Sequence, residues 1–103
     1  MDTNSGEFVM TRQFLILDKT DNVGVALADL PAGSILSGSG LAESVRLKQD
    51  IPAGHKFALS AIGPAQPIRK YGVCIGLSTE AIEAGRHVHV QNIESMRGRG
   101  DRS

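Results

Sequence analysis

The sequence predicts an all-β fold with a few short helical turns, and three observations support this prediction. One short segment that forms a tight corner is repeated along the chain, and each copy precedes a short strand. Between the copies, apolar residues occur in short runs or alternate with polar residues, which is typical of strands. No stretch keeps the 3.6-residue periodicity of an amphipathic helix.

Each corner begins with a branched apolar residue and continues with a turn that contains Gly, Pro or both. Four copies occur, at residues 30–33, 51–54, 62–65 and 82–85. Pro fixes one backbone angle and Gly adopts a conformation that other residues resist, so both favour tight turns. We expect the apolar residue of each copy to be buried and to hold its turn against the sheet. Because the copies are unevenly spaced, they predict short strands joined by similar corners rather than a solenoid.

The predicted strands follow from the apolar runs and from the residues after each corner. A short helical turn is predicted at residues 78–82, where Ser78 is a suitable N-cap. Polar ends predict a disordered N-terminus over 1–10 and a flexible tail over 94–103, which leaves one domain over 11–93. In chain order the predicted strands are 14–17, 23–27, 34–37, 41–48, 55–59, 67–71, 73–75 and 86–92.

Composition limits the protein to one small domain and argues against several function classes. Only 4% of the 103 residues are aromatic, so we expect a thin core of Val, Ile, Leu and Ala. A thin core favours a partner chain or a homo-oligomer. The balance of 11 basic and 11 acidic residues argues against nucleic-acid binding. No apolar run approaches the roughly 20 residues of a membrane helix.

The single cysteine, Cys74, excludes an internal disulfide framework and fits a reducing compartment. The polar and acidic residues 1–6 do not resemble a signal peptide. We therefore predict a cytoplasmic protein. Because Cys74 lies in an apolar segment, we interpret it as a small core residue rather than a reactive thiol.

The segment 86–92 carries two histidines two residues apart. On a strand, His87 and His89 share one face, while Val88 and Val90 share the other and are natural core residues. Two imidazoles on one face can bind a transition metal when a third ligand comes from elsewhere. The alternatives are a solvated strand face, anion binding and proton transfer.

Two further segments carry candidate site residues. His55 and Lys56 stand where a corner becomes a strand, and either can act as an acid, a base or a carboxylate ligand. In the other segment, Arg69 and Lys70 can hold a carboxylate, with Tyr71 as a proton donor. The alternatives are a capping His with a surface Lys, and an amphipathic strand with a half-buried Tyr.

Four segments together resemble the small N-terminal domain of the altronate and galactarate dehydratases, a SAF-group domain with a β-clip fold. The resemblance extends from about Thr11 to Asn92, and Gln91 stands where the family often has a third His. This departure argues against a three-His metal site built from one strand. The segments that carry the resemblance are 21–27, 54–59, 70–76 and 85–89.

The resemblance implies a small subunit that acts with a separate large dehydratase subunit and is inactive alone. The reaction implied is loss of water from an aldonate or aldarate, giving a 2-keto-3-deoxy acid. A divalent metal, Fe(II) or Mn(II), would be held mostly by the large subunit. The expected catalytic residues are His55, Lys56, Tyr71 and His89; Lys56, Arg69 and Lys70 would bind substrate, and His87 and His89 would bind metal.

Three other functions remain open at this point, and one of them is a stand-alone metalloenzyme that uses His87 and His89. The small subunit of sulfolactate sulfo-lyase looks similar, and that enzyme also eliminates a group β to a carboxylate. SAF-like domains also occur as non-catalytic modules, so the chain is alternatively a module that binds acidic sugars or assists assembly of a partner.

Overall fold

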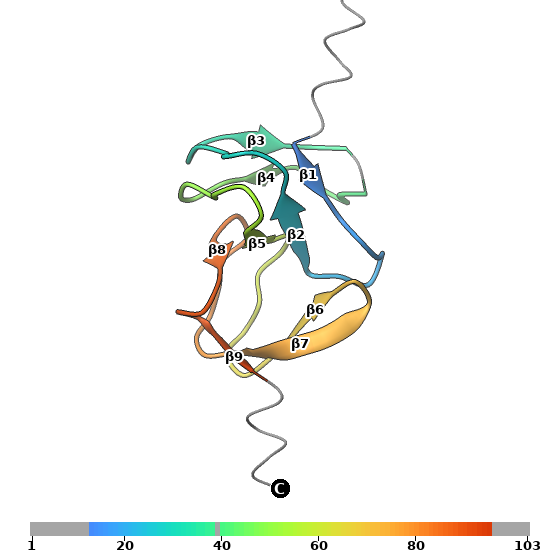
Figure 1. The fold of residues 1–103 in the computed structure, drawn as a ribbon, viewed down its shortest axis with the longest axis vertical. Helices are drawn as coiled ribbons and strands as arrows, with labels where there is room; N and C mark the ends of the chain where they lie inside the picture. The colour runs from blue at the N-terminus through green and yellow to red at the C-terminus, as the bar shows by residue number, and fades with distance from the viewer. Residues whose placement is uncertain (1–12, 39, 96–103) are drawn as a thin grey trace, which may run out of the picture.

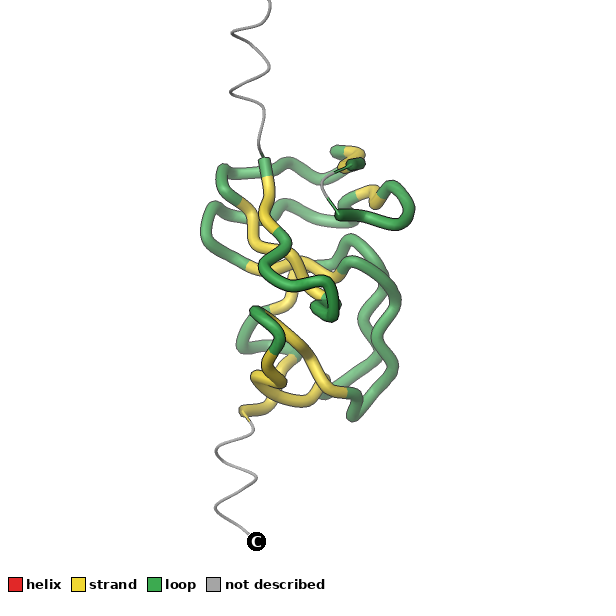
Figure 2. The backbone as a smooth tube through the Cα atoms, turned by 90° about the vertical axis from the view of Figure 1, so that its right-hand side faces the viewer, coloured by secondary structure: helices red, strands yellow, loops and turns green. Residues whose placement is uncertain are grey.

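The computed structural model describes residues 13–38 and 40–95, and these residues form nine short strands (Figure 1). Within this described part of the chain there are strands and loops but no helix, which confirms the predicted all-β fold (Figure 2). The residues predicted to form the disordered N-terminus, and those from 96 onward in the predicted tail, lie outside it. The strands are β1 (Phe14–Leu15), β2 (Val23–Ala26), β3 (Ile35–Leu36), β4 (Val45–Arg46), β5 (Lys56–Ala58), β6 (Pro67–Lys70), β7 (Val73–Ser78), β8 (His87–Val88) and β9 (Ile93–Ser95).

A four-stranded sheet in the order β1-β2-β5-β8 forms the middle of the molecule. Every pairing in it is antiparallel. The β3–β4 ribbon lies next to one face of this sheet. A three-stranded sheet in the order β6-β7-β9 lies next to the other face (Figure 1). The central sheet therefore has a separate layer to cover each of its faces.

The two faces of the central sheet bury two separate cores, because successive side chains on a strand point to opposite faces. Phe57 lies in the core next to the β3–β4 ribbon, with Phe14 against it at a centroid distance of 6.0 Å. The neighbouring Ala58 lies in the core next to β6 and β7, with Ile68 and Val88. The expected aliphatic core is confirmed in the second cluster, but the largest fully buried side chain of the described residues is an aromatic one, Phe57.

The four repeated corners pair two by two. The amide nitrogens of Leu30 and Ile51 each donate to the other's carbonyl oxygen, at 2.9 and 2.8 Å, and Ile62 and Ile82 do the same at 2.8 Å. The apolar residue of every copy is buried, with at most 4% of its surface exposed. The expectation that these residues hold the turns against the sheet is confirmed.

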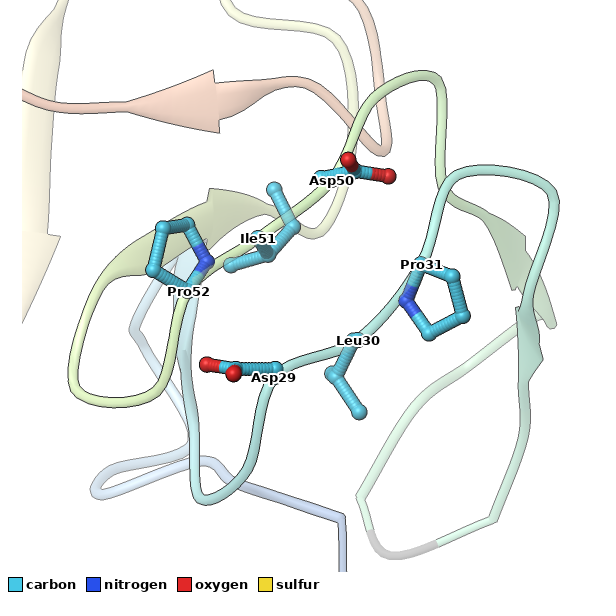
Figure 3. A pocket seen from close by; sticks show the side chains of 6 residues that line it. All are labelled: Asp29, Leu30, Pro31, Asp50, Ile51 and Pro52. Atoms are coloured by element: carbon cyan, nitrogen blue, oxygen red, sulfur yellow. The ribbon is translucent and has the colours of Figure 1, made fainter.

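The first pair of corners also exchanges side-chain hydrogen bonds, through the two acids shown in Figure 3, Asp29 and Asp50. Asp50 Oδ1 accepts from the Ala32 amide at 2.8 Å, and Asp29 Oδ1 accepts from the Ala53 amide at 2.9 Å. A pocket of about 470 Å³ lies between these corners. Because one oxygen of each carboxylate caps the opposite turn, we interpret the two acids as structural.

The fourth position of each corner has a positive φ: 90° at Gly33, 85° at Gly54, 88° at Gly85 and 60° at Ala65. The copy at 62–65 is the one that has alanine rather than glycine at this fourth position. An L-residue in the left-handed region costs about 1–2 kcal/mol, and glycine avoids this cost but loses about 0.5–1 kcal/mol of chain entropy on folding. We therefore expect Ala65→Gly to raise the free energy of unfolding by about 0.5–1 kcal/mol, measured by urea denaturation.

The matched control is Ala32→Gly, because Ala32 precedes Gly33 in the first corner and has no positive φ. In this variant the entropy cost of glycine acts alone, so we expect the free energy of unfolding to fall by about 0.5–1 kcal/mol. A loss in both variants would mean that Ala65 carries no backbone strain.

Two elements differ from the sequence predictions. The helical turn predicted at residues 78–82 is wrong: Ser78 ends β7, and its hydroxyl donates to the Gly63 carbonyl and accepts from the Gln66 amide. The unpredicted strand β9 pairs with β7 and continues to Ser95, two residues beyond the predicted domain boundary. In both cases a partner distant in sequence determines the local structure.

Candidate functional site

All three histidines of the chain lie together on one face of the β5–β8 pair. The antiparallel register places Phe57 opposite His87, so His55 falls opposite His89. The rings stack with interplanar angles of 18–21°, and their centroids are 4.3 Å apart for His55 and His89. The other two centroid distances are 5.0 and 5.3 Å. One ring nitrogen from each residue lies within 4.8 Å of the other two.

Polar contacts inside this histidine cluster fix two of the three rings. His55 Nδ1 and His87 Nε2 are 2.8 Å apart and share a hydrogen bond. The Gln91 amide nitrogen lies 3.3 Å from His87 Nδ1. If that amide donates to Nδ1, His87 carries its proton on Nε2 and donates it to His55. By contrast, His89 Nδ1 is buried and has no hydrogen-bond partner.

Two polar residues that sequence analysis missed hold the backbone of this cluster. The His87 amide donates to Gln49 Oε1 at 3.1 Å. Asn92, which is 98% buried, donates from Nδ2 to the His87 carbonyl and accepts the His89 amide on Oδ1. Nothing in the sequence pairs Gln49 with a residue 38 positions away. For Asn92 the only signal was a polar residue at the end of the predicted strand 86–92.

The turn that Asn92 stabilises also explains a wrong prediction about the valines. Val88 is fully buried, as predicted, but Val90 is 79% exposed. Strand β8 ends at Val88, and the Asn92 amide closes a turn by donating to the His89 carbonyl at 3.0 Å. Strict alternation therefore stops before Val90.

Burial and neighbouring charges lower the pKa values of two of the rings, those of His87 and His89. Burial, then the charges of His55 and Lys56, lower the pKa of His89; the same influences, together with His89, lower the pKa of His87. The group of possible metal ligands consists of the three histidines and contains no carboxylate. In its neutral form each ring offers a lone pair that can accept a proton or bind a cation.

The basic residues form a second group. Lys56 is opposite Val88 in the register, so its side chain starts from the face away from the histidines. Burial, and then the charge of Lys70, lower the pKa of Lys56. Both lysines are partly buried, whereas Arg69 is exposed. Two partly buried cations near one another are suited to an anionic ligand.

Tyr71 lies at the exposed tip of the β6–β7 hairpin and has 71% of its surface exposed. The Asp21 carboxylate accepts the backbone amides of Tyr71 and Gly72, each at 2.8 Å. In the part of the chain that the structure describes, the Tyr71 ring makes no ring contact or hydrogen bond with the imidazoles. The structure thus brings together the three predicted histidines and leaves Tyr71 apart from them.

Residues 12–96 match the family model of the altronate/galactarate dehydratase SAF domain. The chain belongs to this family. Its all-β architecture agrees with the β-clip fold expected for a SAF domain. The histidine cluster and the lysine pair therefore lie within the matched SAF domain. None of its described residues forms a helix that is long and apolar enough to span a membrane.

Curated relatives of this SAF domain fall into two groups. The chain is 44% identical over 80 residues to altronate dehydratase from Escherichia coli and 39% identical over 84 residues to that from Bacillus subtilis. These matches cover 78% and 82% of this chain but only 16% of each dehydratase. The chain is also 34% identical over 93 residues to (2R)-sulfolactate sulfo-lyase subunit alpha from Chromohalobacter salexigens. That match covers 85% of this chain and 99% of the relative.

Proposed function

We propose that this SAF domain is the small subunit of a sugar-acid dehydratase and acts with a separate large catalytic subunit. The observation that carries the proposal is the convergence of all three histidines of the chain, which the pairing of β5 with β8 brings together. The match to nearly the whole of a sulfo-lyase subunit alpha supports a separate small subunit. The substrate class is an aldonate or aldarate, and the product is a 2-keto-3-deoxy acid.

The difficult step in such a reaction is removal of the proton from the carbon next to the carboxylate. A neutral imidazole is suited to this step, and we assign it to His55 or His89. We assign binding of the substrate carboxylate to Lys56, whose charge interacts with that of Lys70, and to Lys70 and the adjacent Arg69. Because Tyr71 lies apart from the histidines, we leave it out of the proposed chemistry.

A divalent metal, Fe(II) or Mn(II), remains part of the proposal. Such an ion would stabilise the negative charge that forms when the proton is removed. Mn(II) prefers oxygen ligands, whereas the histidine cluster offers only nitrogen. We therefore expect oxygen ligands for it to come from the large subunit. We also keep the cytoplasmic location as a prediction.

A second candidate function is elimination from a sulfolactate-like acid. The specific observation in its favour is that the chain matches 99% of the sulfo-lyase subunit alpha but 16% of the altronate dehydratases. The two candidates share proton removal next to a carboxylate and differ in the leaving group. Lys56 and the histidines would have the same roles in both.

Co-purification from the native host, followed by substrate assays, tests the proposal. We expect a larger protein to elute with this chain and the complex to form a 2-keto-3-deoxy acid from one member of a panel of sugar acids. Release of sulfite from (2R)-sulfolactate would instead favour the second candidate. A chain that elutes alone and inert would contradict both and would favour the non-catalytic binding module.

A further inference from the structure

We infer that His55, His87 and His89 together bind one divalent transition-metal ion, and that the isolated small subunit does so without its partner. Sequence reasoning offered only His87 and His89 as ligands. The third ligand, His55, directly precedes a different strand, β5. Gln91 is the hydrogen-bond partner of His87 rather than a ligand. Metal binding itself does not depend on the proposed lyase function; its use in turnover does.

The spacing of the ring nitrogens fits this inference. One nitrogen from each ring lies within 4.8 Å of the other two, and His55 Nδ1 is already 2.8 Å from His87 Nε2. Nitrogens bound at about 2.1 Å around a tetrahedral zinc ion are roughly 3.4 Å apart. Small rotations of the imidazoles therefore suffice to place three nitrogens around one ion. His87 lies in β8, His55 directly precedes β5 and His89 directly follows β8, so the pairing of these two strands already brings the three side chains together.

The hydrogen bonds around the cluster leave nitrogens that an ion would satisfy. His89 Nδ1 is buried without a partner, and such a nitrogen costs about 1–3 kcal/mol. His87 Nδ1 faces the Gln91 side-chain amide, 3.3 Å from its nitrogen. With the amide turned over, Nδ1–H would donate to the Gln91 oxygen and leave Nε2 free as a ligand. Metal-bound histidines commonly have such a partner on the other ring nitrogen.

The donor set predicts which ions bind. Three neutral imidazoles and no carboxylate favour borderline ions such as Zn²⁺, Co²⁺, Ni²⁺ and Fe²⁺ over Mg²⁺, Ca²⁺ and Mn²⁺. Three protein ligands leave at least one coordination position open. The charge of Lys56 acts on both His87 and His89. An anionic oxygen ligand, such as a carboxylate, would fit the open position beside this charge.

The test is metal titration of the full chain, produced without a polyhistidine tag and stripped of metal with a chelator. We expect one equivalent of Zn²⁺ to bind by calorimetry, and one equivalent of Co²⁺ to give visible absorption bands of a four- or five-coordinate site. Mg²⁺ should not compete. Each of the variants His55→Ala, His87→Ala and His89→Ala should weaken binding at least about 100-fold, and Gln91→Ala about 10-fold, the range for an outer-shell partner.

The matched control is Cys74→Ser, which removes the single thiol of the chain and should leave binding unchanged. Since the chain has only three histidines, imidazole ¹⁵N shifts of the unaltered protein report on each ring without any substitution. Zinc should shift a nitrogen in all three rings. Absence of binding by a folded chain, shifts in fewer than three rings, or unchanged affinity in His55→Ala would overturn the inference.

Failure of this inference is distinguishable from failure of the lyase proposal. A chain that binds no metal, but whose complex with the large subunit forms product, would overturn only the metal site. A chain that binds zinc through three rings, but elutes alone and inert, would support the metal site and contradict the lyase.

Discussion

Gly85→Ala is expected to lower the free energy of unfolding by about 1.5–4 kcal/mol, a large part of the stability of a domain this small. This range allows for the roughly 0.5–1 kcal/mol of chain entropy that glycine loses on folding. Gly85 has a φ of 88°, where an L-residue costs about 1–2 kcal/mol. A Cβ atom would also overlap the Arg46 carbonyl oxygen and lie 3.2 Å from Leu47 Cα. These are backbone atoms that cannot rotate away, and overpacking of this kind adds about 1–3 kcal/mol.

The matched control is Gly33→Ala. Gly33 occupies the same position of its corner and has a φ of 90°, but a Cβ there would meet nothing within 4 Å. We therefore expect the free energy of unfolding to fall by only about 0.5–1 kcal/mol, the backbone cost less the chain entropy that glycine loses on folding. Urea denaturation of both variants measures the difference. Equal losses would mean that the contact with Arg46 is not a structural constraint.

This contact also connects the fold to the candidate site. The Gly85 amide donates to the Ala58 carbonyl at 2.8 Å, and the Gly85 carbonyl accepts the Lys48 amide at 2.9 Å. The last corner is thereby held between the end of β5 and the segment that follows β4. Because His87 follows two residues later, the corner determines where β8 meets β5. The same close approach that makes glycine necessary places the histidines together.

The parts of the fold that the sequence predicted correctly are those that depend on local chemistry. A branched apolar residue followed by Pro or Gly forms the same turn wherever it occurs, so Leu30 and Ile82 were correctly expected to be buried. Strands β2 and β5 fall within predicted segments because their apolar runs are bounded by turn residues. Which corners pair with each other was not predictable, since the pairing joins residues about 20 positions apart.

The candidate site was only half predictable for the same reason. The i, i+2 spacing placed His87 and His89 on one face of a strand, and this needs no tertiary information. His55 was chosen separately, from its place after a corner. That the three rings form one cluster depends on the register of β5 with β8, which the sequence does not state. Likewise, strand β9 was missed because its pairing with β7, rather than an apolar pattern, makes it a strand.

His55→Ala is expected to lower kcat of the assembled enzyme at least about tenfold, the lower part of the range for acid–base groups, with little change in KM. The ring stacks on both other histidines and shares a hydrogen bond with His87. Its loss therefore removes either a proton acceptor or a metal ligand, and both act on the step at the carbon next to the carboxylate. The measurement is steady-state kinetics of the reconstituted complex.

The control for this variant is Lys48→Ala, which removes an exposed ion pair with Glu83 at 4.0 Å and should change neither kcat nor stability by a measurable amount. Substrate binding through Lys56 should persist in His55→Ala, because that side chain starts from the other face of the strand. A fall in kcat without a rise in KM would thus assign catalysis to the histidines and substrate binding to Lys56. This division would match their positions on opposite faces of the β5–β8 pair. An unchanged kcat in a complex that assembles normally would remove His55 from the site, and with it the reason for a cluster of three.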